Sequence, residues 1–211
     1  MNIISLENIN KSYGDKGVLK NFSIQIEDGE FIAIMGASGS GKSTLLNIIG
    51  CLESIDSGKL IIDGVDNIKV NSSKSNKILR EKIGYLFQNF ALIDERTVRY
   101  NLEISLKYAS LRKKEKNNRI KEALKYVGLD GYEDKKIYEL SGGEAQRVAL
   151  ARIMLKPCKI ILADEPTGSL DPKNVEVVLN ILKALNKEGK TVVIVTHDEK
   201  VASYCDRVIN I

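Results

Sequence analysis

The octapeptide GASGSGKS, Gly36 to Ser43, constrains the fold of this chain more than any other feature. It has the pattern G-x-x-x-x-G-K-[ST], in which glycines let the backbone turn tightly and direct N–H groups at phosphate oxygens. The apolar run Phe31–Met35 precedes it, and a helical pattern from Lys42 to about Cys51 follows. Because a helix N-terminus favours negative charge, this strand–loop–helix unit predicts a phosphate site. A chance glycine-rich turn is the alternative, and the flanking strand and helix argue against it.

The predicted ligand is ATP, bound with Mg²⁺. We expect Lys42 to reach the β- and γ-phosphates and Ser43 to hold the metal ion. The residues expected to contact the nucleotide are those of the loop and the first helical turn: Gly36, Ala37, Ser38, Gly39, Ser40, Gly41, Lys42, Ser43 and Thr44.

A second motif is the acidic pair Asp164-Glu165, which follows the four apolar residues Ile160–Ala163. An acid at the carboxyl end of a buried strand lies beside the phosphate loop in an α/β architecture. We therefore predict that Asp164 contacts Mg²⁺, and that Glu165 orients or deprotonates the attacking water. The alternative is a solvated acidic pair that begins a loop.

His197 is the only histidine, and it follows the predicted strand Thr191–Val195 by two residues. A lone histidine is more often structural. Its position at the end of a buried strand favours a catalytic role instead, in which it bonds the γ-phosphate and distinguishes ATP from product.

The third motif is Leu140–Glu144, where Ser141, Gly142 and Gly143 open a helix of roughly Glu144–Leu155. Its hydroxyl, free N–H groups and dipole make a second phosphate-binding helix end. One chain has a single phosphate loop, so two such half-sites suggest two chains that complete each other in a closed two-fold dimer. An ordinary Ser-Gly-Gly helix start is the alternative.

Hydrophobic periodicity predicts a mixed architecture. Strands Ile3–Ile9 and Val18–Ile26 alternate as in antiparallel structure, and the later strands alternate with helices as in a mainly parallel sheet. Residues 89–139 are rich in Leu, Lys, Glu and Tyr at helical spacing. We expect an inserted helical subdomain there, with helices at Val98–Ala109 and Lys114–Val127, within one domain spanning residues 1–211.

Composition excludes several classes of protein. The chain is 43% hydrophobic and 28% charged, as is typical of a soluble globular domain, and its net charge of +4 is too small to indicate nucleic-acid binding. No apolar run approaches the ~18 residues of a membrane span, and the N-terminus lacks a secretory pattern. The three cysteines are far apart and lack metal-ligand spacing. We expect a cytoplasmic protein with no nucleic-acid partner.

Together these motifs resemble the ATP-binding cassette (ABC) family over essentially the whole chain. Leu140–Glu144 looks like the signature motif that separates this family from other phosphate-loop ATPases. Tyr13 looks like the aromatic residue that stacks on adenine, and Gln88 like the glutamine that touches Mg²⁺ and water. Ser169–Asp171, with Asp171 at its end, looks like the loop that contacts the other protomer, and His197 like the switch histidine.

The resemblance implies an α/β fold with a phosphate-loop NTPase (RecA-like) core, an N-terminal antiparallel β subdomain and the inserted α-helical subdomain. It implies ATP hydrolysis with Mg²⁺, a homodimer that forms on ATP binding, and a separate integral membrane permease. The chain would then lie peripherally on the inner face of the cell membrane.

Two segments narrow the resemblance further. Asn47–Leu52 and Asp164–Asp171 are similar to the ATPases of the macrolide-exporter and lipoprotein-release group, and Phe87–Arg96 looks most like exporters of bacteriocins or antimicrobial peptides. Asp94–Arg96 departs from the proline-containing stretch usual there, which leaves the choice of permease open. An alternative is an ATP-driven regulator whose membrane partner controls cell-wall hydrolases without transport. Ribosomal and DNA-repair members of the superfamily fit less well, because they carry two cassettes or a long coiled coil.

Overall fold

The computed structural model describes all residues, 1–211, and contains two β-sheets. The first is antiparallel and three-stranded, in the order β2-β1-β4, with bounds Asn2–Tyr13 (β1), Lys16–Glu27 (β2) and Ser57–Ile62 (β4). Ile4 of β1 pairs with Ile26 on one side and Ile62 on the other. The predicted N-terminal strands are present, and both extend beyond their expected ends.

The second sheet is five-stranded and parallel, in the order β5-β6-β7-β3-β8. Its strands are Phe31–Met35 (β3), Ile83–Leu86 (β5), Ile160–Asp164 (β6), Thr191–Val195 (β7) and Arg207–Asn210 (β8). β6 and β7 lie side by side, so Asp164 and the residues that follow Val195 emerge at the same edge. This edge is where ligands bind in open parallel sheets.

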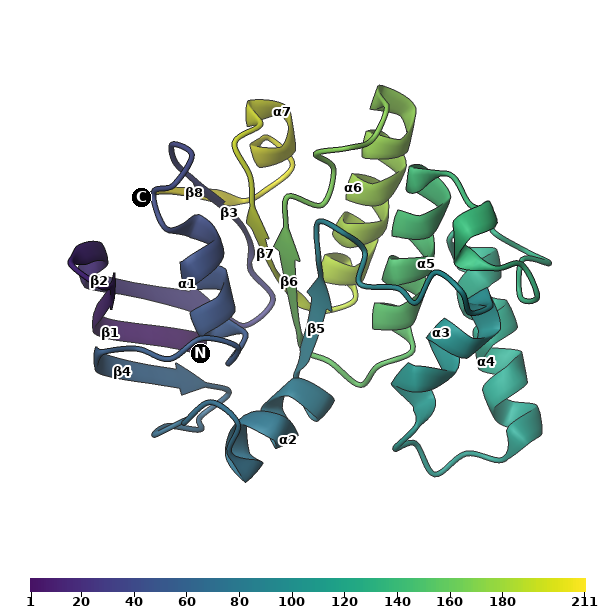
Figure 1. Cartoon of the computed structure of the whole chain (residues 1–211), viewed down its shortest axis with the longest axis horizontal. Helices are drawn as coiled ribbons and strands as arrows, with labels where there is room; N and C mark the ends of the chain where they lie inside the picture. Colours follow the sequence, from purple (N-terminus) through teal and green to yellow (C-terminus); the bar gives the residue numbers. More distant parts are fainter.

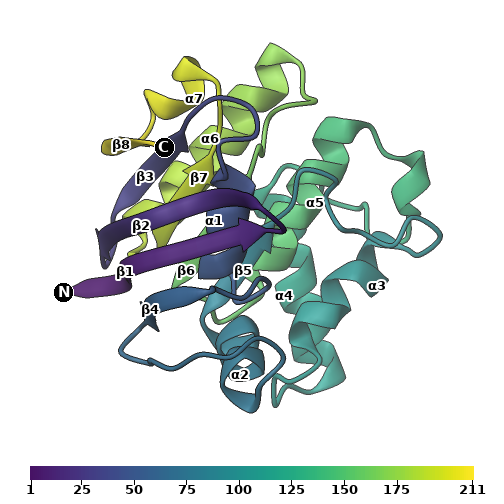
Figure 2. The ribbon, with the colours of Figure 1, turned by 60° about the vertical axis from the view of Figure 1, so that its left-hand side comes forward.

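Helices cover both faces of the parallel sheet. α1 (Lys42–Ile49) lies between this sheet and the antiparallel sheet, while α5 (Gly142–Met154) and α6 (Pro172–Lys187) cover the opposite face (Figure 1). Figure 2 shows the antiparallel sheet in front of α1. Because successive strand residues face opposite sides, Ile160 and Leu162 join the core around α1, whereas Ile161 and Ala163 join the core around α5 and α6.

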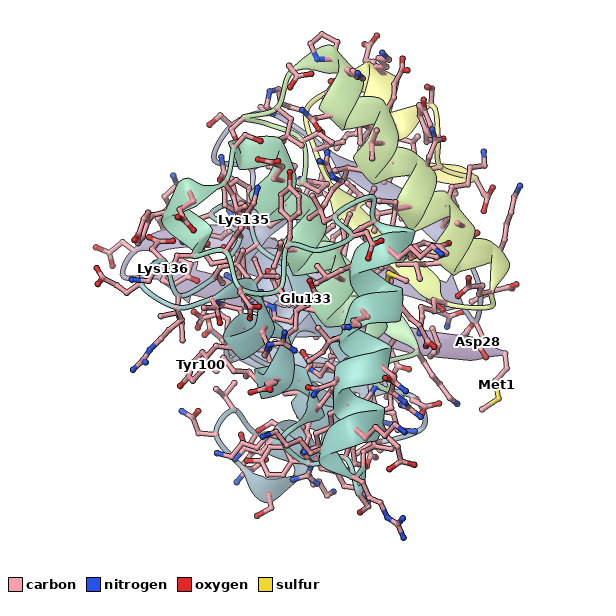
Figure 3. The ribbon with its side chains drawn as sticks, turned by 90° about the vertical axis from the view of Figure 1, so that its right-hand side faces the viewer. Met1, Asp28, Tyr100, Glu133, Lys135 and Lys136 are labelled. Atoms are coloured by element: carbon pink, nitrogen blue, oxygen red, sulfur yellow. The ribbon has the colours of Figure 1, made fainter.

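Between β5 and α5 the chain forms four helices joined by loops, and no strand. They are α3 (Val98–Glu103), a 3-10 helix (Ile104–Leu106), α4 (Lys113–Tyr126) and a second 3-10 helix (Ile137–Glu139). The single helix expected at Val98–Ala109 is therefore wrong in its second half. The α-helix ends at Glu103, and the tighter 3-10 turn brings Leu106 into the core with no exposed surface. Glu133 and Lys135 accept hydrogen bonds from the first N–H groups of α3, so this stretch runs beside α3 (Figure 3).

Four further elements were not expected from the sequence. They are the helices α2 (Ser73–Glu81) and α7 (Glu199–Ala202), and the strands β5 and β8 at the two edges of the parallel sheet. None of the helices has the length and hydrophobicity needed to cross a membrane.

Candidate active site

The phosphate loop connects β3 to α1, as expected. Gly41 has a left-handed backbone (φ 102°), and a Cβ placed there would lie 2.6 Å from Cγ1 of Val18. Both the conformation and the space therefore require glycine at this position. Since Val18 belongs to β2, the antiparallel sheet supports the phosphate loop directly.

Lys42 is 8% exposed, and its ammonium group donates hydrogen bonds to the carbonyls of Gly36 and Ala37, both at 2.8 Å. No carboxylate lies within salt-bridge distance of it. A buried charge is costly unless an opposite charge compensates it. This arrangement leaves a cation prepared for an anionic ligand such as a phosphate chain.

Ser43 in α1 and Asp164 at the end of β6 are in contact: the Ser43 hydroxyl donates a hydrogen bond to Oδ1 of Asp164 at 3.1 Å. Burial raises the pKa of the Asp164 carboxyl, while the Ser43 hydrogen bond and the Lys42 charge act in the opposite direction. A hydroxyl and a carboxylate are the oxygen ligands that Mg²⁺ takes alongside phosphate oxygens. The two side chains thus fit the predicted metal contacts.

Glu165 and His197 also meet, with Oε1 of Glu165 and Nδ1 of His197 2.8 Å apart. Glu165 has a left-handed backbone (φ 43°), and its N–H donates to the carbonyl of Val195. Its side chain is 16% exposed, whereas that of His197 is 73% exposed. The structure therefore places a carboxylate beside an imidazole at the edge where β6 and β7 end.

One cavity of about 630 Å³ lies between the phosphate loop, Glu165 and His197, and Asp164 reaches it only through its contact with Ser43. The predicted site residues that line it are Tyr13, Gly36, Ala37, Ser38, Gly39, Gly41, Lys42, Ser43, Thr44, Glu165 and His197. Lys16 and Val18 line it too, and sequence reasoning missed them. Their place in the hairpin with Tyr13 was the available signal, because β2 returns directly alongside β1. Ser40 is not in the lining; its hydroxyl is buried without a partner.

The second predicted phosphate-binding helix end lies outside this cavity. Ser141 caps α5, and Glu144 accepts hydrogen bonds from the N–H and hydroxyl of Ser141. A Cβ on Gly143 would lie 2.4 Å from the side chain of Asn174, which donates to Asp171. Ser141, Gly142, Gly143 and Asp171 thus gather at the starts of α5 and α6, apart from the phosphate loop.

Gln88 is exposed, and it does not line the cavity. It follows β5 at the start of a turn in which Phe90 and Ala91 are both left-handed (φ 62° and 47°). Arg152 of α5 donates to the carbonyls of both residues. Arg152 thus holds the turn that carries Gln88 against α5.

A lysine-bearing loop between a parallel strand and a helix, with an acid and a base at the neighbouring strand ends, defines a phosphate-loop NTPase. The profile of the ABC transporter family matches residues 19–168. This chain belongs to that family and is an ATPase.

Relatives and solved structures agree with this membership. The chain is 44% identical to the uncharacterized ABC transporter ATP-binding protein YvrO of Bacillus subtilis, covering 98% of this chain and 92% of the relative. It is 45% identical to the macrolide export ATP-binding/permease protein MacB of Mannheimia succiniciproducens, of which it spans only 33%. A dimeric structure of the bacterial ABC transporter cassette MJ0796 superposes with a TM-score of 0.91 at 44% identity, covering 99% of this chain and 94% of that one.

A second dimeric structure of MJ0796, described as a post-hydrolysis state bound to ADP and Pi, also has a TM-score of 0.91, at 42% identity. It covers the same shares of the two chains, 99% and 94%. The expected phosphate-loop NTPase fold, with its antiparallel and parallel sheets, is confirmed.

Proposed function

We propose that this ATPase is the energy-coupling subunit of an export system, working with a permease that is a separate chain. The proposed cargo is a peptide, bacteriocin, lipoprotein or antibiotic, in keeping with the macrolide-exporter relatives. The observation that carries the catalytic part is the single cavity shared by Lys42, Glu165 and His197.

In the proposed cycle, ATP binds with its phosphates along Gly36–Thr44 and its adenine against Tyr13. Ser43, Asp164 and Gln88 would hold Mg²⁺, which would supply positive charge to neutralise the phosphates. Glu165 directs the attacking water and His197 bonds the γ-phosphate.

The proposed active form is a homodimer in which Ser141, Gly142 and Gly143 of one chain contact the γ-phosphate held by the other. Two features support it: these residues lie outside their own chain's cavity, and the similar MJ0796 cassettes are dimeric. Asp171, at the start of α6, is the proposed contact across the dimer. Loss of the γ-phosphate would remove contacts between the chains and loosen the dimer.

The proposed permease contact is a cleft of about 830 Å³ beside the loop that carries Gln88, with Phe87 and Ala91 in its lining. Ile104 and Tyr108, from the helical segment, line it as well. We take residues 89–139 as the helical subdomain through which the permease follows opening and closing of the dimer. In this proposal the chain lies on the inner face of the cell membrane.

The test is to express tagged Glu165→Gln protein in its own host and purify it from detergent-solubilised membranes with ATP and Mg²⁺. Lys42→Ala protein, purified in the same way, is the control for nucleotide dependence. An integral membrane partner in stoichiometric amount supports the proposal. Recovery only in the soluble fraction, with ribosomes or DNA, would overturn the transporter role while leaving the ATPase assignment intact.

A further inference from the structure

Gln146 is a buried polar side chain on a helix face that is otherwise apolar. It is 1% exposed, and the other buried residues of α5 are glycine, alanine, valine, leucine and isoleucine. Its Nε2 donates to the carbonyl of Pro166, 20 residues further along the chain, while its Oε1 has no partner. An unpaired buried amide oxygen costs free energy that an apolar side chain would avoid. Packing alone therefore does not explain this residue.

Pro166 directly follows Glu165, and the backbone between them is strained. Glu165 has a left-handed φ, which is unfavourable for a residue with a Cβ, so the surroundings must hold it. The Glu165 N–H donates to Val195, and its carbonyl accepts from the N–H of Gly168. Proline has no N–H to donate. The Gln146 amide therefore holds the carbonyl of Pro166, the residue after Glu165, and so helps to set the backbone direction of the turn that follows Glu165.

The neighbouring residue on α5 holds the other end of the same loop. Arg147 donates to Oδ1 of Asn174 at 2.6 Å, and Asn174 in turn donates to Asp171. Two consecutive side chains of one helix thus hold a loop that begins at Glu165 and ends at Asp171. Because α5 begins at Gly142, a shift of this helix would move both ends of the loop.

We propose that Gln146 is a positioning residue for Glu165, acting through the carbonyl of Pro166. This inference rests on the proposed role of Glu165 as the residue that directs water. Through Gln146, hydrolysis in one chain would depend on the position of that chain's α5. The N-terminal end of α5 is the surface proposed to contact the nucleotide held by the second chain. The side chain does not line the nucleotide cavity, so its expected effect is on turnover and not on binding.

The test uses Gln146→Met, which keeps the length of the side chain and removes its amide donor. We expect ATP affinity, measured by equilibrium titration, to stay within about twofold, and kcat to fall at least about tenfold, since the general base is misplaced. Gln146→Asn keeps the amide but withdraws it by one methylene, and it should give a smaller loss of kcat. It also provides a second variant should Gln146→Met not fold.

A double-mutant cycle separates positioning from general damage. In a Glu165→Gln background, Gln146→Met should cause no further loss of the residual rate, because residues that act as a unit are non-additive. Val148→Ala, a buried change on the same helix, is the stability control: it should lower the melting temperature without lowering kcat below that temperature. Equal loss in both backgrounds, an unchanged kcat, or a loss confined to ATP affinity would each overturn the inference. If Glu165→Gln alone turned over at the wild-type rate, the proposed role of Glu165 would fail first.

Discussion

Nδ1 of His197 lies 2.8 Å from Oε1 of Glu165, so the two residues expected to act on different parts of the reaction contact each other. The carboxylate thereby has a partner on the side that faces the cavity. An imidazole that holds a base and also reaches the γ-phosphate would couple the position of the base to the presence of ATP.

His197→Ala should therefore slow hydrolysis and leave ATP binding intact. We expect kcat to fall about 10²–10³-fold, the usual effect of removing one group that stabilises transition-state charge. Steady-state kinetics and equilibrium nucleotide binding check this together. A variant with normal kcat and weakened ATP binding would show that His197 contributes to ground-state affinity instead.

Lys42→Ala should strongly weaken nucleotide binding. Lys42 is buried and has only carbonyl partners, so it is the main cation available to the phosphates. Loss of charge-assisted bonds of about 1.5–3 kcal/mol in total corresponds to at least about 10- to 100-fold weaker affinity. Isothermal titration with ATP measures the change. Lys16→Ala, at the rim of the same cavity, is the control and should have a much smaller effect.

The two glycines at the start of α5 should respond differently to alanine. At Gly143 the new methyl would lie 2.4 Å from the Asn174 side chain, whereas at Gly142 it would meet Phe90 and Leu170 at 3.9 and 4.0 Å. Gly143→Ala should therefore destabilise the fold by about 1–3 kcal/mol, as overpacking does. Gly142→Ala should be nearly neutral in thermal unfolding. Equal melting temperatures for the two variants would contradict the described packing.

Glu144→Gln should weaken the fold in a pH-dependent way. The Ser141 N–H and the Tyr132 hydroxyl donate to the carboxylate and lower the pKa of Glu144. A depressed pKa in the folded state stabilises it above the unfolded pKa of about 4.3, and this contribution is lost as the pH falls through the folded value. We expect a loss of about 1 kcal/mol at pH 7.

The difference between wild type and Glu144→Gln should shrink as the pH is lowered below about 4.3. Urea unfolding of both proteins across pH 3.5–7 measures it. Tyr132→Phe removes only one of the hydrogen bonds to Glu144, so its effect should be smaller. A difference that grew at low pH would have the wrong sign for this mechanism.

The sequence predicted the features that depend on neighbouring residues. The loop at Gly36–Ser43, its strand and its helix are local, and the continuous apolar run Ile160–Ala163 indicated a buried strand. By contrast, α2 has only Ser75 and Ile78 buried, so its apolar stripe is too thin to stand out. The capping box of Ser72 with Ser75 was the signal that could have revealed it. β8 is short and mostly exposed, which hides a strand pattern.

The contacts between elements could not be predicted in the same way. Nothing local links Gln146 with Pro166, or Gly143 with Asn174, because the packing of α5 against its neighbours creates both contacts.

The alternation along β6 has a consequence for cooperativity. Ile160 and Leu162 serve one hydrophobic core and Ile161 and Ala163 the other, so the two cores share a backbone. Unfolding of either core would expose to water the face of β6 that packs against it. The strand that supports the other core would then lose half of its packing. The layers are therefore expected to unfold in one calorimetric transition, with equal van't Hoff and calorimetric enthalpies, and not as separately melting halves.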